Sequence, residues 1–240
     1  MGCDIHLYVE RKVEGAWKSV HDFAPDKYGE GVADVSYEDR WYSDRNYDLF
    51  AILADVRNGH GFAGVATGEG FTPIADPKGI PADCDPQIKA RSDEWGGDGH
   101  SHSHFTLAEL LAYDWQQSTR KFGVVNGPEM DRWSGWRRSR GLGPESYSAD
   151  VMGSGISKGT ESELTAALKR TSDAHPGDRK ARNEAIERTL GRTYARITWI
   201  EAYHRAADGF WSDLMPRLTS TAFREHLSFD DIRIVFWFDN

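Results

Sequence analysis

The beginning of the chain shows a regular alternation of apolar and polar side chains. Every second residue from Ile5 to Val9 is aliphatic, and the residues between them carry polar atoms. A period of two is typical of a β-strand with one buried face. The pattern continues to Val13, and the turn that follows predicts a hairpin with residues 17–23. The chain is therefore expected to open with two antiparallel strands.

The end of the chain carries the strongest strand pattern. Residues 232–238, with the sequence IRIVFWF, are apolar on both faces of an extended chain. Strands of this kind lie in the middle of a sheet, where both faces are covered. We expect this strand to pair beside the strand at 4–9, so that both ends of the chain share one mixed or antiparallel sheet. The predicted fold class is α+β, with packed helices and long irregular loops.

Helices are predicted where apolar residues recur every three or four positions after a capping residue. Thr106 with Glu109, and Thr160 with Glu163, form the capping-box pattern that begins a helix. Residues 193–204 alternate loosely and fit either a helix or a strand. The predicted helices are 46–57, 106–115, 160–171 and 208–218, and a short strand is predicted at 121–126.

Two stretches lack a clear pattern. Residues 60–97 are rich in Gly, Pro and Asp, and we expect them to be irregular apart from a short turn at Asp85-Pro86. Loops of this length are usually functional or disordered. Residues 172–192 are strongly charged, so they fit either an exposed helix or a mobile excursion and are the best candidate for an insertion. No internal repeat is visible, and the 240 residues are expected to form a single domain.

Composition narrows the classes of protein. A formal net charge of -9 argues against broad nucleic-acid binding, which needs a basic face, but it allows a small nucleotide in a local basic pocket. There is no run of about 18 apolar residues that could span a membrane. The first residues lack the pattern of a secretory signal, and two cysteines do not make a disulfide framework. We therefore expect a soluble cytoplasmic protein, whose oligomeric state the sequence leaves open.

Asp4 and His6 form the first candidate site. On a strand, their side chains project from the same face with Cα atoms about 6–7 Å apart. A carboxylate and an imidazole placed in this way at the end of a strand can bind a metal ion. The alternative is a polar strand face at the edge of the sheet that binds nothing.

The segment from Asp98 to His104 reads DGHSHSH and forms the second candidate site. If the segment is extended, its three histidines share one face with Asp98. If it is instead the turn that enters the helix at Thr106, His100 and His104 lie near each other. The alternative to a functional site is a mobile histidine-rich loop that takes up metal adventitiously.

These two groups together predict a metal centre. Mixed histidine and carboxylate ligands suit zinc, manganese or iron better than magnesium or calcium. Such a divalent transition metal would supply a Lewis acid or a bound hydroxide. Asp98 would orient a histidine or act as a base, and His104 is a further candidate catalytic residue. The predicted metal ligands are Asp4, His6, His100 and His102.

Arg45, Arg57 and Asn58 flank the first predicted helix. A guanidinium group can form a fork of hydrogen bonds to a phosphate, so these three residues are candidates for substrate binding. Arg57 is also a candidate for stabilising the reacting phosphate. The alternative for Arg57 is a favourable charge at the C-terminal end of a helix.

A second basic segment interleaves arginines with tryptophans. Guanidinium and indole groups suit phosphate pairing and base stacking, which makes Trp133 and Arg137 further candidates for substrate binding. The alternative is a solvated basic loop whose tryptophans turn into the core. The segment contains Arg132, Trp133, Trp136, Arg137, Arg138 and Arg140.

Six blocks of sequence span both ends of the chain: MGCDIH at 1–6, RNY at 45–47, LADVRN at 53–58, KGIP at 78–81, DGHSHS at 98–103 and VFWFDN at 235–240. In this order they resemble a family of bacteriophage and prophage proteins with no established activity. The resemblance implies a phage-encoded protein that acts in the bacterial cytoplasm. The chain departs from the family pattern at His104-Phe105, where Trp-Leu is frequent, and this puts His104 in doubt as a ligand.

Three functions are compatible with these features, in decreasing order of preference. The first is a metal-dependent hydrolase, specifically a phosphoesterase that acts on a nucleotide or a nucleotide-derived host defence signal. The second is a binding protein without catalysis, which sequesters such a signal or inhibits a host protein. The third is a structural or virion-associated protein, which would leave the histidines unexplained. Stoichiometric metal with turnover would favour the first, and ligand retention without turnover the second.

Overall fold

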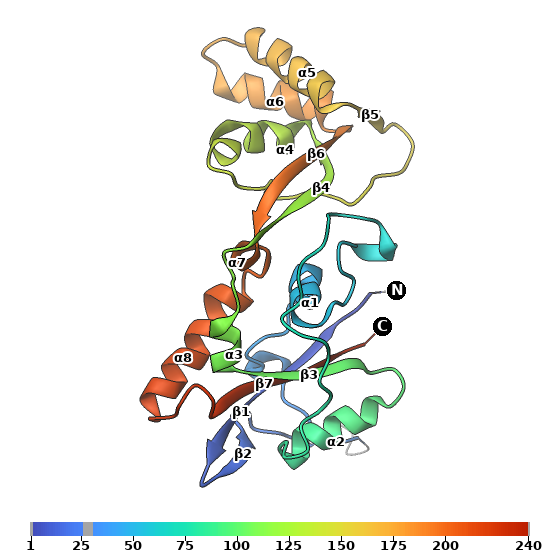
Figure 1. Ribbon diagram of the computed structural model, residues 1–240. Coiled ribbons are helices and arrows are strands. Elements are labelled where there is room, and N and C mark those ends of the chain that lie inside the picture. The colour runs from blue at the N-terminus through green and yellow to red at the C-terminus, as the bar shows by residue number, and fades with distance from the viewer. Residues whose placement is uncertain (1, 26–30, 240) are drawn as a thin grey trace. The chain divides into compact units, whose positions relative to one another are not determined.

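The computed structural model describes residues 2–25 and 31–239, and its contacts divide the chain into two compact units (Figure 1). Unit 1 comprises Met1–Asn58, Phe71–Gln117 and Tyr203–Asn240, and unit 2 comprises Gly59–Gly70 and Ser118–Ala202. The expectation of a single domain stays a prediction, because this division does not test whether either unit folds alone. Met1 and Asn240, the ends of the resembling blocks, lie outside the described residues.

Unit 1 is built on an antiparallel sheet of four strands, in which the N-terminal and C-terminal strands are neighbours. Residues of the two strands pair from Ile5 opposite Phe238 to Arg11 opposite Ile232. The predicted α+β class and the shared sheet are therefore confirmed. In spatial order the strands are β2 (Ala16–Ser19), β1 (Ile5–Val13), β7 (Ile232–Phe238) and β3 (His100–Thr106).

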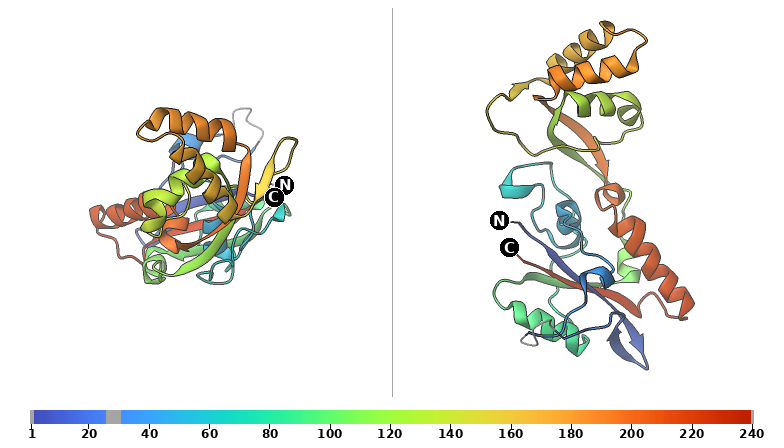
Figure 2. Two further views of the ribbon diagram at one scale, coloured as in Figure 1. Left: turned by 90° about the horizontal axis from the view of Figure 1, so that it is seen from above. Right: turned by 180° about the vertical axis from the view of Figure 1, so that it is seen from behind.

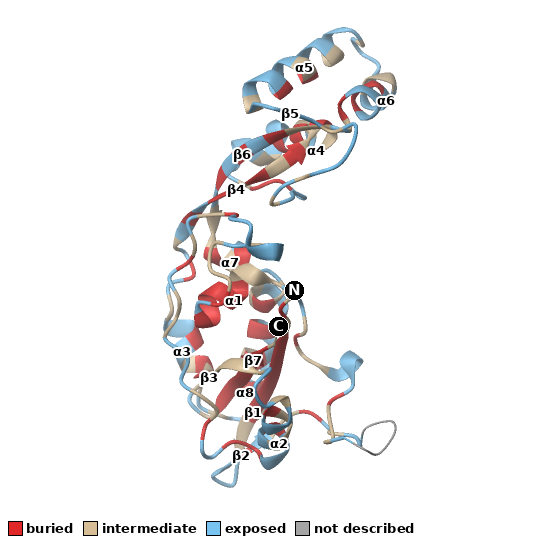
Figure 3. Ribbon diagram, turned by 90° about the vertical axis from the view of Figure 1, so that its right-hand side faces the viewer, coloured by how far each residue is buried: buried red, intermediate tan, exposed pale blue. Residues whose placement is uncertain are grey.

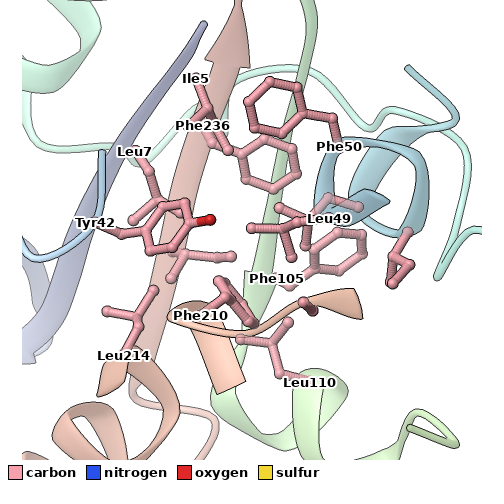
Figure 4. Packing of buried hydrophobic residues seen from close by; sticks show 14 of the residues in the cluster. Ile5, Leu7, Tyr42, Leu49, Phe50, Phe105, Leu110, Phe210, Leu214 and Phe236 are labelled. Atoms are coloured by element: carbon pink, nitrogen blue, oxygen red, sulfur yellow. The ribbon is translucent and has the colours of Figure 1, made fainter. Parts of the chain in front are cut away.

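Every residue of β7 is buried, because helices or loops cover both faces of the sheet (Figure 3). On one face, Phe236 and Phe238 belong to a large apolar cluster with Leu49 and Phe50, which Figure 4 shows from close by. The helical segments of this layer are α1 (Tyr47–Ala54), α3 (Leu107–Ala112), α7 (Tyr203–Ala206), the π-helical turn η4 (Phe210–Leu214) and α8 (Met215–Arg224).

The opposite face of β7 packs against α2 (Pro86–Trp95). Val235 and Trp237 contact Ile88 of this helix in a smaller apolar cluster. The sequence predicted only a short turn here, because α2 buries a single large apolar side chain and otherwise reads as polar. Its start is nevertheless encoded, since the Asp85 side chain accepts a hydrogen bond from the Gln87 N–H.

A buried ion pair joins β1 and β7. Glu10 lies directly opposite Arg233 in the register, and the Arg233 Nε donates to Glu10 Oε2 at 2.6 Å. Glu10 is fully buried, and the Arg233 guanidinium lies 3.9 Å from the centroid of the Trp17 ring. Such a pair adds little net stability, but removing one partner leaves an uncompensated buried charge.

Unit 2 contains a three-stranded sheet with helices on one face (Figure 2). Met130, Trp133, Leu164 and Ile186 pack there against Ile197 of the central strand. Its strands, in spatial order, are β4 (Ser118–Asn126), β6 (Thr193–Ala202) and β5 (Ser157–Gly159), and its helices are α4 (Gly127–Arg132), the π-helical turn η3 (Trp133–Arg137), α5 (Glu161–Asp173) and α6 (Arg179–Leu190). Short 3-10 turns are η1 (Tyr37–Asp39) in unit 1 and η2 (Phe62–Gly64) in unit 2.

Several boundaries differ from the predictions. The helix predicted at 46–57 ends earlier, because Asp55 adopts a left-handed conformation with φ of 59°. Of residues 193–204, which fitted a helix or a strand, 193–202 form β6 and the last two begin α7. The charged segment 172–192 contains α6, whose Ile186 and Leu190 are buried in the core of unit 2. No helix within 2–25 or 31–239 is long and apolar enough to cross a membrane.

We expect Phe50→Ala to destabilise the protein by about 3–5 kcal/mol, because Phe50 is fully buried and its ring lies 4.9 Å from that of Phe238. Chemical denaturation monitored by circular dichroism measures the change. The matched control is Phe223→Ala, because Phe223 is 68% exposed and its loss should cost about 1 kcal/mol or less. Equal destabilisation by both variants would contradict the packing described for α1.

Candidate functional site

The site predicted on β1 is organised by an aspartate from the other end of the chain. Asp239 accepts the Asp4 backbone N–H on Oδ1 at 3.0 Å, and its Oδ2 lies 3.2 Å from His6 Nε2. The sequence analysis did not select Asp239 as a site residue. Its signal is the register of the sheet, since pairing Ile5 with Phe238 places the residues that flank this pair beside each other.

His6 is held as a buried imidazole between two indole rings. The ring centroids lie 4.3 Å from Trp95 and 5.5 Å from Trp237. Burial lowers the pKa of His6, and the neighbouring Asp239 carboxylate opposes that shift. The Nδ1 atom is buried without a hydrogen-bond partner among the described residues. A neutral imidazole that donates from Nε2 to Asp239 therefore leaves Nδ1 as a shielded acceptor.

The Asp4 carboxylate forms an ion pair with a guanidinium group. Arg45 donates to both Asp4 oxygens, from Nε at 2.7 Å and from Nη2 at 2.6 Å. This hydrogen bonding lowers the pKa of Asp4, and about half of each side chain is exposed. The predicted metal ligand and the predicted phosphate-binding arginine therefore engage each other.

Arg57 and Asn58 also have partners within unit 1. Arg57 donates from Nη2 to the Gly2 carbonyl at 3.3 Å, and its guanidinium lies 5.1 Å from the Tyr47 ring centroid. The Asn58 side chain accepts from the Phe71 N–H at 2.6 Å and donates to the Phe71 carbonyl at 2.7 Å. Asn58 therefore joins two distant segments of the chain, which explains it without a substrate.

The histidine-rich segment is extended, which was one of the two predicted alternatives. Its three histidines, however, do not share one face. A register shift lies between His100 and Ser103, and Ser101 within it has a φ of 52°. The His100 ring stacks on Phe238 at 6.0 Å, whereas His102 stacks on Trp237 at 5.9 Å. Phe238 and Trp237 are neighbours in β7, so their side chains point to opposite faces of the sheet. Because of the bulge, His100 and His102 also lie on opposite faces.

His104 and Asp98, the other two candidates of this segment, lie close to backbone carbonyl groups. His104 Nδ1 lies 3.1 Å from the Gly79 carbonyl, and burial lowers its pKa. Asp98 is exposed in the turn after α2, where its N–H donates to the Trp95 carbonyl. Within the described residues, neither side chain forms a hydrogen bond or ion pair with another predicted site residue.

The positions of the four predicted ligands show whether they can bind one metal ion. Asp4 is engaged by Arg45, and His100 lies on the opposite face of the sheet from His6 and His102. Among residues 2–25 and 31–239, no group of three or more His, Cys, Asp or Glu side chains is arranged to hold a metal ion. The four predicted ligands therefore do not assemble into the predicted centre.

The second basic segment contributes to a cavity of about 440 Å³ in unit 2, lined by residues of α4, η3 and α6. From α6 come residues at positions 179, 182, 183, 186 and 187, a spacing of three and four that places them on one face of the helix. The sequence does not predict this stripe, because its residues line a space that forms only when α4 and η3 pack beside α6. The charged, amide and aromatic wall residues of the cavity are Asp131, Arg132, Trp136, Arg137, Glu145, Arg179, Arg182, Asn183 and Glu187.

Most of the cavity's guanidinium groups are paired with carboxylates. Arg182 forms two hydrogen bonds with Asp131, and Arg137 Nη1 donates to Glu145 Oε1 at 3.1 Å. Arg132 Nη2 donates to Glu129 Oε2 at 2.6 Å. Arg179 is exposed and forms no hydrogen bond or ion pair with any residue in the described parts of the chain.

The two tryptophans of this segment have different environments. Trp133 is 1% exposed, and its indole N–H donates to the Leu142 carbonyl at 2.8 Å. It therefore belongs to the core, as the alternative interpretation held, and it does not face a ligand. Trp136 is 56% exposed and lines the cavity, with the Arg137 and Arg140 guanidinium groups 5.7 and 5.1 Å from its ring centroid.

No protein-family model, curated protein or solved structure matches this chain.

We expect acidification from pH 7 to pH 5 to destabilise the protein. The folded state lowers the pKa of His6 below its usual 6.5, so the unfolded chain binds the proton more readily and gains stability as the pH falls. In His6→Gln, where the amide can still donate to Asp239, the loss of unfolding free energy between pH 7 and pH 5 should be smaller. An unchanged pH dependence in this variant, measured by chemical denaturation, would contradict the assignment.

Proposed function

We propose that the protein binds a phosphorylated small molecule in the cavity of unit 2 and retains it without turnover. The observation that carries the proposal is the wall of this cavity, where arginines of α4, η3 and α6 and an exposed tryptophan face one space. Its volume of about 440 Å³ lies in the range of about 300–1,000 Å³ that is usual for small-molecule sites.

The distribution of charge supports an anionic ligand. Of the chain's 29 Lys and Arg residues 15 lie in unit 2, and of its 38 Asp and Glu residues 12 lie there. Unit 2 is thus basic, although the whole chain has a net charge of -9. Within the cavity, Arg179 offers a guanidinium group that no carboxylate of the described residues neutralises. A phosphate group would supply the missing charge-assisted hydrogen bonds.

The chemistry of the wall supports binding rather than catalysis. The titratable groups other than arginine that line the cavity are Asp131, Glu145 and Glu187. Two of them are held by arginines, and no histidine, cysteine or hydroxyl side chain of the described residues lines the space. A nucleophilic side chain beside a base, the arrangement that covalent catalysis requires, is therefore not present among the described residues of this wall.

The metal-dependent hydrolase favoured by the sequence lacks comparable support. It needs Asp4, His6, His100 and His102 around one ion, and the bulge at Ser101 divides these residues between the two faces of the sheet. The resemblance to phage proteins gives the binding function a setting: the ligand would be a phosphorylated signal of the infected bacterium, withdrawn from solution by sequestration.

We expect Arg179→Ala to weaken the binding of inorganic pyrophosphate about tenfold or more, because hydrogen bonds to charged groups contribute about 1.5–3 kcal/mol. Isothermal titration calorimetry on the full chain measures the affinity. The matched control is Arg188→Ala, an exposed arginine of α6 that does not line the cavity, which should change the affinity less than about twofold. No binding by the wild type, or equal losses in both variants, would refute the proposal.

A further inference from the structure

The cavity of unit 2 has a feature that a phosphate group alone does not need. Trp136 is 56% exposed on its wall, whereas Trp17, Trp115, Trp133, Trp199 and Trp237 are all buried. A large aromatic side chain in contact with water forgoes the stabilisation that burial would give it. Its exposure inside a concave site is explained if a flat aromatic ring covers it when the ligand binds.

The surroundings of Trp136 favour such stacking. Two guanidinium groups lie near its ring, Arg140 at 5.1 Å and Arg137 at 5.7 Å from the centroid. Arg140 has no carboxylate partner among the described residues, and its guanidinium group lies over the Trp136 ring without lining the cavity. Nucleobases stack on indole rings and on guanidinium planes, and they do so with little dependence on the base.

The wall of the cavity offers two kinds of chemistry. Trp136 lies in η3, whereas Arg179, at the start of α6, carries the guanidinium group without a carboxylate partner. Asn183 lies one turn further along the same face of α6 and adds an amide that can both donate and accept. One ligand that places a ring on Trp136 and a phosphate beside Arg179 would contact both kinds of side chain.

We propose, resting on the function proposed above, that the ligand is a single nucleotide with its base on Trp136 and its phosphates beside Arg179 and Asn183. The cavity of about 440 Å³ lies near the lower end of the usual range for small-molecule sites, which suits one nucleotide better than a linked pair. The chemical class is a nucleoside mono- or diphosphate.

The experiment compares adenosine diphosphate with inorganic pyrophosphate by calorimetry on the full chain. Both carry a diphosphate group, so the difference in their affinities reports the nucleoside. We expect the nucleotide to bind about tenfold tighter or more, because stacking of one base contributes about 1–3 kcal/mol. Trp136→Ala should remove this advantage and leave pyrophosphate binding unchanged, while Trp136→Phe should restore part of it. Because Trp136 is largely exposed, we expect both variants to fold.

The outcomes separate the two proposals. Pyrophosphate binding that depends on Arg179, with no tighter binding of adenosine diphosphate, would overturn the nucleotide assignment and leave the phosphate-binding function standing. An advantage for the nucleotide that survives in Trp136→Ala would also overturn it. If neither ligand binds the wild type, the proposed function fails as well. A cyclic dinucleotide that binds tighter than adenosine diphosphate would overturn the inference that the site holds one nucleotide.

Discussion

The burial of β7 is the constraint on which unit 1 depends. This strand is apolar on both faces, so it must lie between two neighbouring strands and under two layers of packing. The aromatic cluster around Phe50 supplies one layer, and α2 with its buried Ile88 supplies the other. Because β1 pairs with β7, the same constraint brings Asp4 and His6 to Asp239, which is 235 and 233 residues away from them along the chain.

A sheet covered on both faces also determines what its edge strand can do. A strand that alternated regularly through His100, His102 and His104 would present all three imidazoles to one layer. The left-handed Ser101 breaks this alternation, so one histidine joins Phe238 and the next joins Trp237. The histidine-rich segment thus contributes side chains to the packing of both layers.

The sequence predicted those features that depend on local patterns. The two-residue period and the apolar run form the strands β1 and β7, as predicted. Both capping boxes begin helices at the predicted positions. It did not predict the bulge at Ser101, because a register shift depends on the partner strand and leaves no mark in the spacing of histidines. The α6 face was missed for a related reason: its residues line a space that exists only when α4 and η3 pack beside it. Trp133 and Trp136 differ by three positions, and only tertiary contacts show which of them faces solvent.

The Glu10–Arg233 pair has a further consequence for how β7 finds its place. A strand with apolar side chains on both faces could pair with β1 in several registers and bury apolar side chains in each of them. A slip by one residue would turn Arg233 toward the aromatic layer and leave Glu10 enclosed without its partner. The ion pair therefore selects one register of β7 on β1, because every other register would bury a charge without its partner.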